Sequence, residues 1–325
     1  MGSSFADYQM AIRDFMKAAQ LTQYGGKEVI TIGDIPAPII EDGKILIQVK
    51  AAGVNPFDWK VQQGYMKDFI PLKLPIVLGG DFAGVVVEVG ASVSDFKKGD
   101  EVYGQANAVA GNSGAFAEMT LTTSTSVALK PKTLEFAQAG ALPLVGVSAI
   151  QALIDTMKLT KGQKILIHGG AGGIGSIAIQ IAKNIGAHVA TTGSANDFDF
   201  IKQLGADELI DYKTQKFEDT LKMYDAVFDT VGGETTNRSL SVLKNGGILV
   251  SMTQPADETV VKEQQIKAVV QGTQVTTERL KKLTQLVESG VVKVNVEKTF
   301  PLEQAADALE YLKTTPPKGK VVIVM

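Results

Sequence analysis

The sequence predicts a two-domain α/β protein in which a mostly β domain is followed by a doubly wound parallel sheet. Up to about Gly140, β-branched apolar segments alternate with turns rich in Pro and Gly. From about Ala141, helical and strand patterns alternate, as right-handed βαβ crossovers require. A glycine-rich turn joins a strand to an amphipathic helix within 164–186. With 325 residues, the chain is long enough for two separate cores.

Three segments predict the first domain. KILIQVKAAGV (44–54) alternates and is β-branched, FAGVVVEVG (82–90) is a second strand, and KKGDEVYG (97–104) is a turn that feeds a third. They indicate a compact, mostly antiparallel β domain. Residues 1–15 differ in character from the rest of the chain: MGSS resembles an expression leader, and we expect the native fold to start at Met16.

The second domain is predicted from alternating patterns. We expect helices at 141–157, 174–185, 196–205, 234–247 and 276–290, and strands at 164–168, 188–193, 206–212, 225–233, 248–252 and 265–273. The helices 196–205 and 234–247 are expected to stop at their glycines. After residue 290, VNVEKTFP, a helix through EQAADALEYLKT and the closing KVVIVM return to β character. We therefore assign 16–140 and 290–325 to one discontinuous domain and 141–289 to an inserted domain.

The turn Gly170-Ala171-Gly172-Gly173-Ile174-Gly175 is a G-x-G-x-x-G motif. It follows the buried strand KILIH and opens a helix with an apolar stripe, which is the context of a dinucleotide-binding turn. Glycines let the backbone approach a pyrophosphate, and the helix N-terminus offers unpaired N–H groups. We expect the backbone of Gly172, Gly173 and Ile174 to hold the pyrophosphate. An ordinary glycine-rich turn is the alternative.

Composition excludes several function classes. The net charge of −3 and the lack of a long apolar run give no sign of nucleic-acid or membrane binding. The absence of cysteine excludes disulfides, a thiol nucleophile and thiolate metal sites. The two histidines, His168 and His188, both fall in predicted strands, so we expect structural roles for them rather than zinc binding or a Ser-His-Asp triad. No secretory signal is evident, which predicts a cytoplasmic location.

Several blocks occur in order along the chain. They are AAGVNPFDWKVQQG (51–64), LGGDFAGVVVEVG (78–90), KKGDEVYG (97–104), GAFAEM (114–119), LPLVGVSA (142–149), HGGAGGIGSIAIQIAK (168–183), LGADELIDY (204–212), FDTVGG (228–233) and GKVVIVM (319–325). Together they resemble the medium-chain dehydrogenase/reductase superfamily, in its zinc-free quinone oxidoreductase branch, over Met16 to Met325. The NPFDWKVQQG block is most similar to alkenal/enone and quinone reductases. The resemblance implies a GroES-like β domain, a Rossmann domain, an active site in the cleft between them, and a homodimer.

The same resemblance predicts that no metal is bound. In zinc-dependent relatives a Cys follows the AAGV-like strand and a Gly-His-Glu adds ligand chemistry. Here the first stretch is Gly53-Val54-Asn55-Pro56 and the second is Gly79-Gly80-Asp81. Without a Lewis acid, alcohol oxidation is disfavoured, whereas a quinone or enone accepts hydride without metal assistance.

The end of the second inserted-domain strand favours NADPH over NADH. NAD enzymes usually carry an acid there, but this chain has Thr192-Gly193-Ser194. Ser194 can donate to a 2′-phosphate, and Tyr212 matches a family tyrosine that contacts the same group. Asp197 stands where some relatives carry a lysine; helix capping is its alternative role. Lys202 is a substitute cation or a solvated surface charge.

Further coenzyme contacts follow from the resemblance alone. Ser148 stands where relatives often have Thr near the nicotinamide. Val231 and Gly232 would pass beside the adenosine and ribose, and Ser251 and Thr253 would lie near the nicotinamide ribose. For Ser148 and Val231, as for the other residues of this set, a plain turn or packing role is the alternative.

The predicted reaction is hydride transfer to a quinone or to the β-carbon of an α,β-unsaturated carbonyl. Negative charge then develops on the carbonyl oxygen, where the protein must supply donors. The resemblance makes Asn55 the first donor, and Lys60 is a cationic second. Tyr65 closes the pocket or relays a proton, and water is the expected final proton donor. The alternatives are a solvated Lys60 or its contact with Asp58, and a packing role for Tyr65.

Two other functions remain open at this point. A 2-enoyl thioester reductase of similar fold would need an extended pocket and basic residues for the carrier, and no such cluster is evident. A nucleotide-binding scaffold would bind NADPH with little turnover. The natural acceptor depends on the loops 65–76 and 105–114, which carry no decisive motif.

Overall fold

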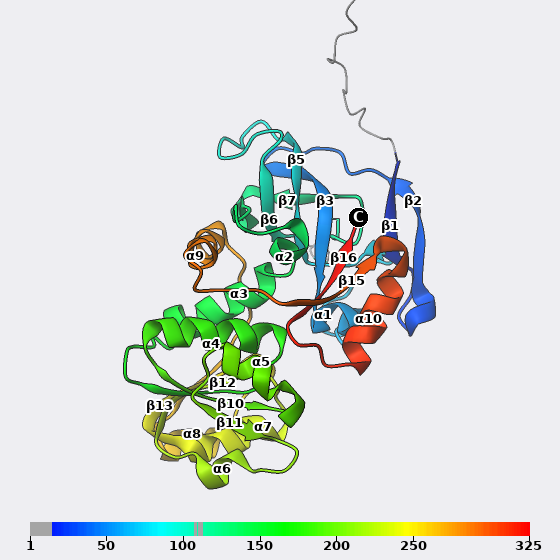
Figure 1. The fold of residues 1–325 in the computed structure, drawn as a ribbon. Coiled ribbons are helices and arrows are strands. Elements are labelled where there is room, and N and C mark those ends of the chain that lie inside the picture. Colours follow the sequence, from blue (N-terminus) through cyan, green and yellow to red (C-terminus); the bar gives the residue numbers. More distant parts are fainter. Residues whose placement is uncertain (1–14, 107–108, 110–112) are drawn as a thin grey trace, which may run out of the picture.

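The computed structural model describes residues 15–106, 109 and 113–325, which form two lobes joined at a narrow waist (Figure 1). The upper lobe holds strands from both ends of the chain, and the lower lobe holds the middle. The predicted leader 1–15 lies outside the described residues except for Phe15, where β1 (Phe15–Leu21) begins. Part of the loop 105–114 also lies outside them. Within the described part of the chain, no helix is both long and apolar enough to cross a membrane.

The upper lobe is built on an extended mixed sheet with the strand order β15-β16-β3-β5-β6-β8, and β7 pairs with β3. A small sheet, β2-β1-β4, packs beside it. The bounds are β2 Ile30–Pro36, β3 Lys44–Val54, β4 Ile76–Val77, β5 Asp81–Val89, β6 Glu101–Gln105, β7 Met119–Thr123, β8 Val127–Leu129, β15 Val296–Pro301 and β16 Lys320–Val324. The predicted antiparallel strands are confirmed. The C-terminal strand also returns to this lobe as predicted, because β16 pairs antiparallel with β3.

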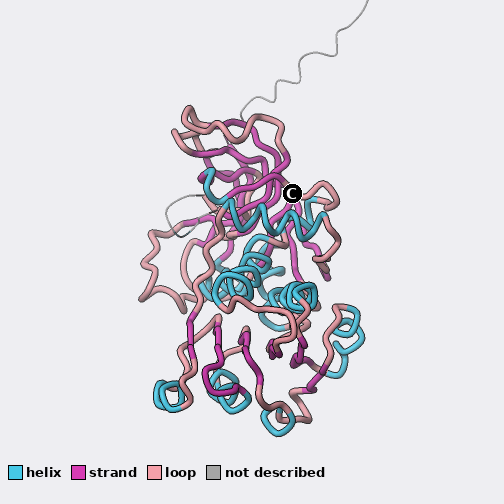
Figure 2. Tube along the Cα trace, turned by 90° about the vertical axis from the view of Figure 1, so that its left-hand side faces the viewer, coloured by secondary structure: helices cyan, strands magenta, loops and turns pink. Residues whose placement is uncertain are grey.

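The lower lobe is a parallel sheet with the order β11-β10-β9-β12-β13-β14. The strands are β9 Lys164–Ile167, β10 His188–Gly193, β11 Glu208–Asp211, β12 Tyr224–Asp229, β13 Leu243–Ser251 and β14 Lys267–Val270. Helices cover both of its faces, as Figure 2 shows. The strand order reverses between β9 and β12, and ligands of such sheets bind beyond the carboxyl ends of the strands at this switch point.

The helices also follow the predicted order. They are α1 Pro56–Gln62, α2 Phe136–Gly140, α3 Pro143–Ile150, α4 Gly173–Ile185, α5 Phe198–Gln203, α6 Phe217–Thr220, α7 Glu234–Arg238, α8 Glu258–Glu263, α9 Thr277–Glu288 and α10 Ala305–Thr314. The helix predicted at 141–157 is α3 continued by a π-helix over 151–156. The glycine stop of the helix predicted at 196–205 is confirmed, because Gly205 follows α5 with φ +97°.

The helix predicted at 234–247 is wrong in its second half. It ends as a 3-10 turn at Ser239–Val242, and β13 already begins at Leu243. The glycines that looked like a helix stop lie inside the strand, where the pairing with β12 shifts register between Tyr224 and Ala226. Gly246 takes φ +74° at this irregularity, a conformation that favours glycine. Sheet pairing therefore overrides the local helical pattern.

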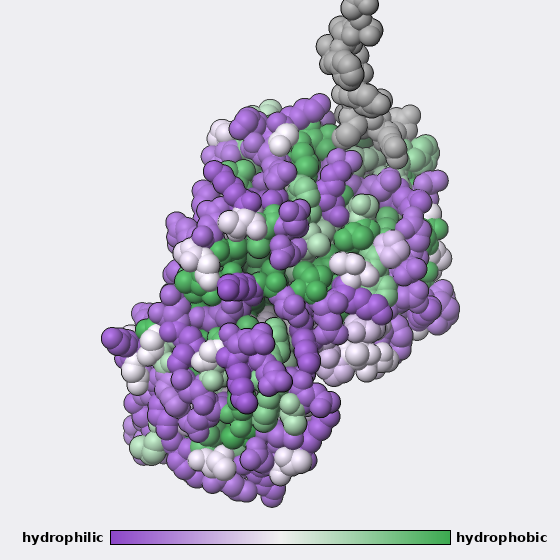
Figure 3. All heavy atoms as spheres, viewed as in Figure 1, coloured by the Kyte–Doolittle hydropathy of each residue, from purple (hydrophilic) through white to green (hydrophobic). Residues whose placement is uncertain are grey.

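The two lobes share a buried contact that fixes their relative position. Ala83 and Tyr103 of the upper lobe pack in the same hydrophobic cluster as residues of α3 and α9. The buried Tyr103 hydroxyl donates a 2.7 Å hydrogen bond to the carbonyl oxygen of Leu280 in α9. Figure 3 shows a mainly hydrophilic surface with hydrophobic patches near the waist. These buried contacts therefore hold the two lobes together on one side of the space between them.

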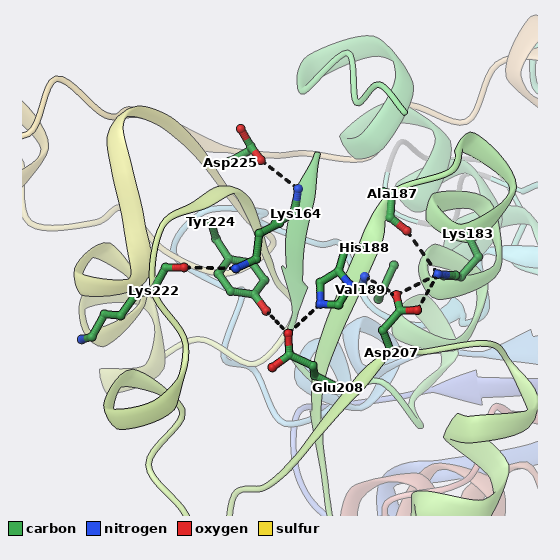
Figure 4. Close-up of polar contacts among 10 residues, drawn as sticks. All are labelled: Lys164, Lys183, Ala187, His188, Val189, Asp207, Glu208, Lys222, Tyr224 and Asp225. Carbon is green, nitrogen blue, oxygen red and sulfur yellow. Dashed lines mark hydrogen bonds and ion pairs between the residues drawn. The ribbon is translucent and has the colours of Figure 1, made fainter. Parts of the chain in front are cut away.

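A polar cluster lies at the edge where the strands of the parallel sheet begin (Figure 4). His188 Nε2 lies 2.6 Å from Glu208 Oε1, and the Tyr224 hydroxyl donates to the same oxygen at 2.9 Å. Lys183 Nζ, at the end of α4, donates to both carboxylate oxygens of Asp207 at 2.7 and 2.8 Å. These contacts give His188 the structural role expected of it and tie α4 to the sheet.

We predict that Asp207→Asn lowers the free energy of unfolding by roughly 0.5–1 kcal/mol at pH 7, the value of a partly exposed ion pair. Burial raises the pKa of Asp207, but hydrogen bonds from Lys183 and the Val189 N–H outweigh it and hold this pKa below its usual value. Because its pKa is lower in the folded state, ionised Asp207 contributes its full stability at pH values above its unfolded-state pKa. This contribution is lost as the pH falls through the folded-state pKa. The difference between wild type and variant should therefore shrink as urea unfolding is repeated from pH 6 down to pH 3.

The control is Glu263→Gln at an exposed position, which should change stability by less than about 0.5 kcal/mol at every pH. A difference for Asp207→Asn that stays constant across the pH range would show that the ion pair is not its cause.

Candidate functional site

A cavity of about 620 Å³ lies at the switch point of the parallel sheet. The lower lobe contributes the glycine turn and the carboxyl ends of β9, β10 and β12. The upper lobe contributes residues 54–56 and 316–317 and the start of β16. The cavity therefore lies between the lobes, where the sequence predicts the active site.

The glycine turn is shaped by close backbone packing. A Cβ atom at Gly170 would lie 2.2 Å from Thr191 Oγ1, and one at Gly175 would lie 2.1 Å from the carbonyl oxygen of Gly169. These two glycines are therefore required for the turn to pack on β10 and on itself. Gly172, the N-cap of α4, differs: the nearest atom to its Cβ would be the Gly169 oxygen at 3.4 Å, and the remaining space opens into the cavity.

This open cradle fits a pyrophosphate. It lies at the N-terminus of α4, where the first-turn N–H groups have no partners within the helix and the helix dipole favours an anion. Gly172, Gly173 and Ile174 all line the cavity, and their contact with a coenzyme stays a prediction.

Ser194, which follows β10, and Tyr212, which follows β11, line the cavity, and Tyr212 is 59% exposed. The Ser194 hydroxyl donates a 2.6 Å hydrogen bond to Asp197 Oδ2, and Asp197 caps the turn that precedes α5. Lys318 Nζ lies 3.7 Å from Asp197 Oδ1. The capping role expected of Asp197 is thus observed, and the cation beside it is Lys318, whereas Lys202 is exposed and outside the cavity lining.

The structure brings seven of the predicted site residues to the cavity: Asn55, Gly172, Gly173, Ile174, Ser194, Tyr212 and Val231. Six others lie outside its lining: Lys60, Tyr65, Ser148, Gly232, Ser251 and Thr253.

Helix packing accounts for the position of Ser148. Its fully buried hydroxyl donates to the Leu144 carbonyl at 2.7 Å and lies 2.6 Å from Thr273 Oγ1. A contact between Ser148 and a coenzyme stays a prediction.

Hydrogen bonds within two turns account for the positions of Gly232, Ser251 and Thr253. Asp229 Oδ1 accepts hydrogen bonds from the N–H groups of Val231 and Gly232 at 2.9 and 3.0 Å. Ser251 Oγ accepts from the Thr253 N–H at 3.2 Å. Gly232 has φ +82°, so glycine suits this turn whether or not a ligand is near. Their coenzyme contacts stay predictions.

Lys60 and Tyr65 gather around Trp59 instead of the cavity. Lys60 Nζ lies 5.7 Å from the centre of the Trp59 ring, and the Tyr65 ring meets the same ring edge-on at 6.0 Å. Tyr65 is 63% exposed. Asp58 accepts a 2.8 Å hydrogen bond from the N–H of Asn55 and caps α1. The catalytic roles of Lys60 and Tyr65 stay predictions.

A buried polar network at the upper-lobe wall was missed by sequence reasoning. Lys320 is 4% exposed and lines the cavity. Its Nζ donates to the Val54 carbonyl at 2.8 Å and to Asn55 Oδ1 at 2.5 Å. Asn55 Nδ2 in turn donates to Asp81 Oδ2 at 2.9 Å. The available signal was a lone lysine opening the otherwise apolar strand KVVIV.

Burial sets the electrostatics of this network. It raises the pKa of Asp81 to about 6 and that of Asp58 to about 7, and it lowers the pKa of Lys320. The attraction between Lys320 and the two carboxylates opposes each of these shifts. In the described ranges, no three His, Asp or Glu side chains are grouped so that they could hold a metal ion.

His168 directly follows β9 on the cavity wall, and both of its ring nitrogens have hydrogen-bond partners. Nε2 lies 2.9 Å from Ser239 Oγ, and Nδ1 lies 3.2 Å from Thr192 Oγ1. Burial lowers the pKa of His168 to about 4, so the ring is neutral at pH 7. Arg238 and Phe217, which the sequence analysis did not single out, complete this end of the cavity.

Two family models match the chain. One, described as an alcohol dehydrogenase GroES-like domain, covers residues 41–132, and one described as a zinc-binding dehydrogenase covers residues 204–323. The chain is 40% identical to a chloroplastic NADPH-dependent alkenal/one oxidoreductase of Arabidopsis thaliana, over 95% of this chain and 79% of that protein. It is 39% identical to a 2-methylene-furan-3-one reductase of Solanum lycopersicum, over 97% and 80%.

A solved structure of a similar protein has the same fold. The quinone oxidoreductase of Coxiella burnetii superposes with a TM-score of 0.90 at 34% identity, over 96% of this chain and 99% of that one. The two-lobe arrangement and the cavity between the lobes are therefore set in a fold that known oxidoreductases share.

We predict that Gly172→Ala and Gly175→Ala separate binding from folding. The Gly172 methyl enters the open cradle, so the variant should melt like wild type and bind NADPH roughly tenfold more weakly, a loss of about 1.4 kcal/mol. The Gly175 methyl meets backbone, so that variant should lose several degrees of melting temperature or fail to fold. Thermal melts and fluorescence titration with NADPH measure both effects.

Gly33→Ala is the control, because a Cβ there meets nothing within 4 Å and lies in β2, far along the chain from the turn. An unchanged affinity in a folded Gly172→Ala variant would place the pyrophosphate elsewhere.

Proposed function

The chain belongs to the medium-chain dehydrogenase/reductase superfamily, in its quinone and alkenal/enone oxidoreductase branch, and from this we propose its function. It is an NADPH-dependent oxidoreductase that transfers hydride to a quinone or to the C=C bond of an α,β-unsaturated carbonyl. Similar proteins that are named for alkenal/one, furanone and quinone activities support this. The observation that carries it is the cavity where the glycine turn of one lobe faces Asn55 of the other.

The chain offers a place for each charged part of the coenzyme. The Gly172 cradle and the start of α4 suit the pyrophosphate. Ser194 after β10 and Tyr212 after β11 suit a 2′-phosphate. No acidic residue stands at the end of β10 itself. Asp197 lines this part of the cavity, and Lys318 Nζ lies 3.7 Å from its Oδ1, where it offsets the charge that would repel the phosphate. When bound, NADPH supplies the hydride for the reaction.

Asn55 is our candidate for the residue that stabilises the acceptor. The carbonyl oxygen of a quinone or enone gains negative charge when hydride adds, and one well-placed N–H donor there is worth about 2.7–4 kcal/mol. Asn55 lines the cavity and is 3% exposed, so its amide acts in a site with little water. We infer that the final proton comes from water, because the neutral His168 ring is already engaged with Thr192 and Ser239.

We also propose that the reaction needs no zinc. Asn55 follows the AAGV strand and Gly80 precedes Asp81, at the places where zinc-dependent relatives carry ligand residues, and the chain has no cysteine. A cytoplasmic location, a homodimer, and the domain bounds 16–140 with 290–325 and 141–289 complete the proposal. An enoyl thioester reductase and an NADPH-binding scaffold are the competing functions, and assays with different acceptors separate them.

We predict NADPH oxidation with 9,10-phenanthrenequinone and with a short 2-alkenal, and little with an enoyl thioester. Steady-state absorbance at 340 nm measures all three, and NADH in place of NADPH should give at least tenfold lower kcat/KM. Tight NADPH binding without turnover of any acceptor would favour the scaffold, and preference for the thioester would favour the enoyl thioester reductase.

Metal removal gives an independent test. Dialysis against 1,10-phenanthroline and EDTA should leave the quinone reductase activity within about twofold, and elemental analysis should find less than stoichiometric zinc. Loss of activity on chelation that added zinc restores would refute the metal-free mechanism.

A further inference from the structure

Lys320 connects the coenzyme-binding turn to Asn55. The residue before it, Gly319, forms a bridge with Gly172 and donates its N–H to the Ala171 carbonyl at 2.8 Å. The aliphatic stem of Lys320 passes the turn so closely that a Cβ at Gly173 would lie 2.9 Å from its Cδ. The ammonium then reaches across to Asn55 and the Val54 carbonyl.

The neighbours of Asn55 leave its amide one orientation. An ammonium can only donate, so Lys320 requires an oxygen, which is Oδ1 of Asn55. A carboxylate of the buried Asp81 accepts, so it requires the NH2 end, and Nδ2 donates to it. The Asp58 N–H also donates to the Asn55 side chain in the capping box of α1, which favours the same orientation. A flipped amide would face the Lys320 ammonium with its NH2 group and the Asp81 carboxylate with its oxygen. The second Nδ2 hydrogen has no acceptor in residues 15–106, 109 and 113–325 and remains for a ligand.

We propose that Lys320 is a positioning residue for the hydride transfer: it locks the Asn55 amide so that an N–H, and not the oxygen, meets the carbonyl oxygen of the acceptor. The inference rests on the proposed function, in which Asn55 is the donor. A flipped amide would present Oδ1 to the acceptor and would repel the developing negative charge.

The charge of Lys320 also balances this wall of the cavity. In the part of the chain that the structure describes, the charged groups acting on its ammonium are Asp81, from β5, and Asp58, from α1. Both carboxyl groups are buried, which makes their charged forms costly and raises their pKa values. Removing the ammonium leaves both carboxylates without a counter-ion. The turn at Gly173, which also packs against Lys320, carries no charged side chain.

The main experiment is a double-mutant cycle on Lys320→Met, Asn55→Ala and the combined variant. Met keeps the length of the stem, so Lys320→Met should bind NADPH within about threefold of wild type. Its kcat and kcat/KM for the quinone should both fall 10- to 100-fold, as for an interaction made only in the transition state. Because Lys320 acts through Asn55, the double variant should be no slower than Asn55→Ala alone.

The control is Lys313→Met, an exposed lysine of α10 that pairs with Glu310 and lies outside the cavity lining. It should match wild type in every measurement. Fully multiplicative losses of kcat in the double variant, or an unchanged kcat in Lys320→Met, would overturn the proposal.

Two readouts on the coenzyme-free protein do not depend on turnover. In the NMR spectrum of asparagine-labelled wild type, the Asn55 side-chain NH2, assigned by its absence in Asn55→Ala, should show one slowly exchanging proton bonded to Asp81. In Lys320→Met this protection should fall at least tenfold, because the amide loses the ammonium that holds its oxygen and its hydrogen bond to Asp81 opens more often. Equal protection in both proteins would show that Lys320 does not fix the amide.

The pH dependence of stability is the second readout. Because Asp81 and Asp58 have raised folded-state pKa values, the native protein binds more protons than the unfolded chain between about pH 4 and 7, and their contribution to stability falls as the pH rises. In Lys320→Met the two pKa values rise further, so the loss of stability from pH 5 to pH 8 should be steeper. A parallel shift of the curve would indicate lost packing only.

If Lys320→Met fails to fold, Lys320→Met with Asp81→Asn removes both charges together. This variant should recover stability at pH 8 while its kcat stays at least tenfold below wild type, because both partners that orient Asn55 are gone. Recovery of kcat with stability would refute the positioning role. A wild type that reduces no acceptor would refute the proposed function instead, and the NMR and stability measurements would still test the network.

Discussion

The pairing of β16 with β3 is the constraint on which the cavity depends. It carries the last residues of the chain from the waist into the sheet of the upper lobe, next to Val54 and Asn55. The same segment bridges Gly172 through Gly319. The coenzyme-binding turn and the acceptor-binding wall are thus held by consecutive residues of one strand, so a shift of one residue in its register would move Lys320 to the opposite face and dismantle both.

Much of the fold could be predicted because its signals are local. The strand at 44–54 and the helix after the glycine turn each repeat their apolar pattern within one segment. The glycine spacing also encodes short-range contacts, such as Gly175 against Gly169. The second half of the helix at 234–247 could not be predicted this way, because its residues pair with β12, a contact that the local pattern does not contain.

The candidate site divides along the same line. Ser194 was identified because it stands directly after a recognisable strand end, and Asn55 because its sequence block resembles that of known reductases. Lys320 was missed because its partners lie more than two hundred residues earlier in the chain, and only the returning strand brings them together. Lys60 is the converse case: its place next to the NPFDW block made it a candidate, but the turn of α1 sets its ammonium over Trp59.

Stability alone does not explain why Lys320 is charged. Replacing a buried ion pair with apolar residues of similar volume is often neutral or stabilising, and the rest of β16 is apolar and buried. An apolar side chain at this position would therefore suit the strand, provided Asp81 were also apolar. Such a pair would lose the ammonium and the carboxylate that together define which end of the Asn55 amide faces the ligand. Burying the charged groups of this network costs stability. In return, the network fixes an N–H donor in the cavity, at the place where the acceptor's oxygen gains its charge.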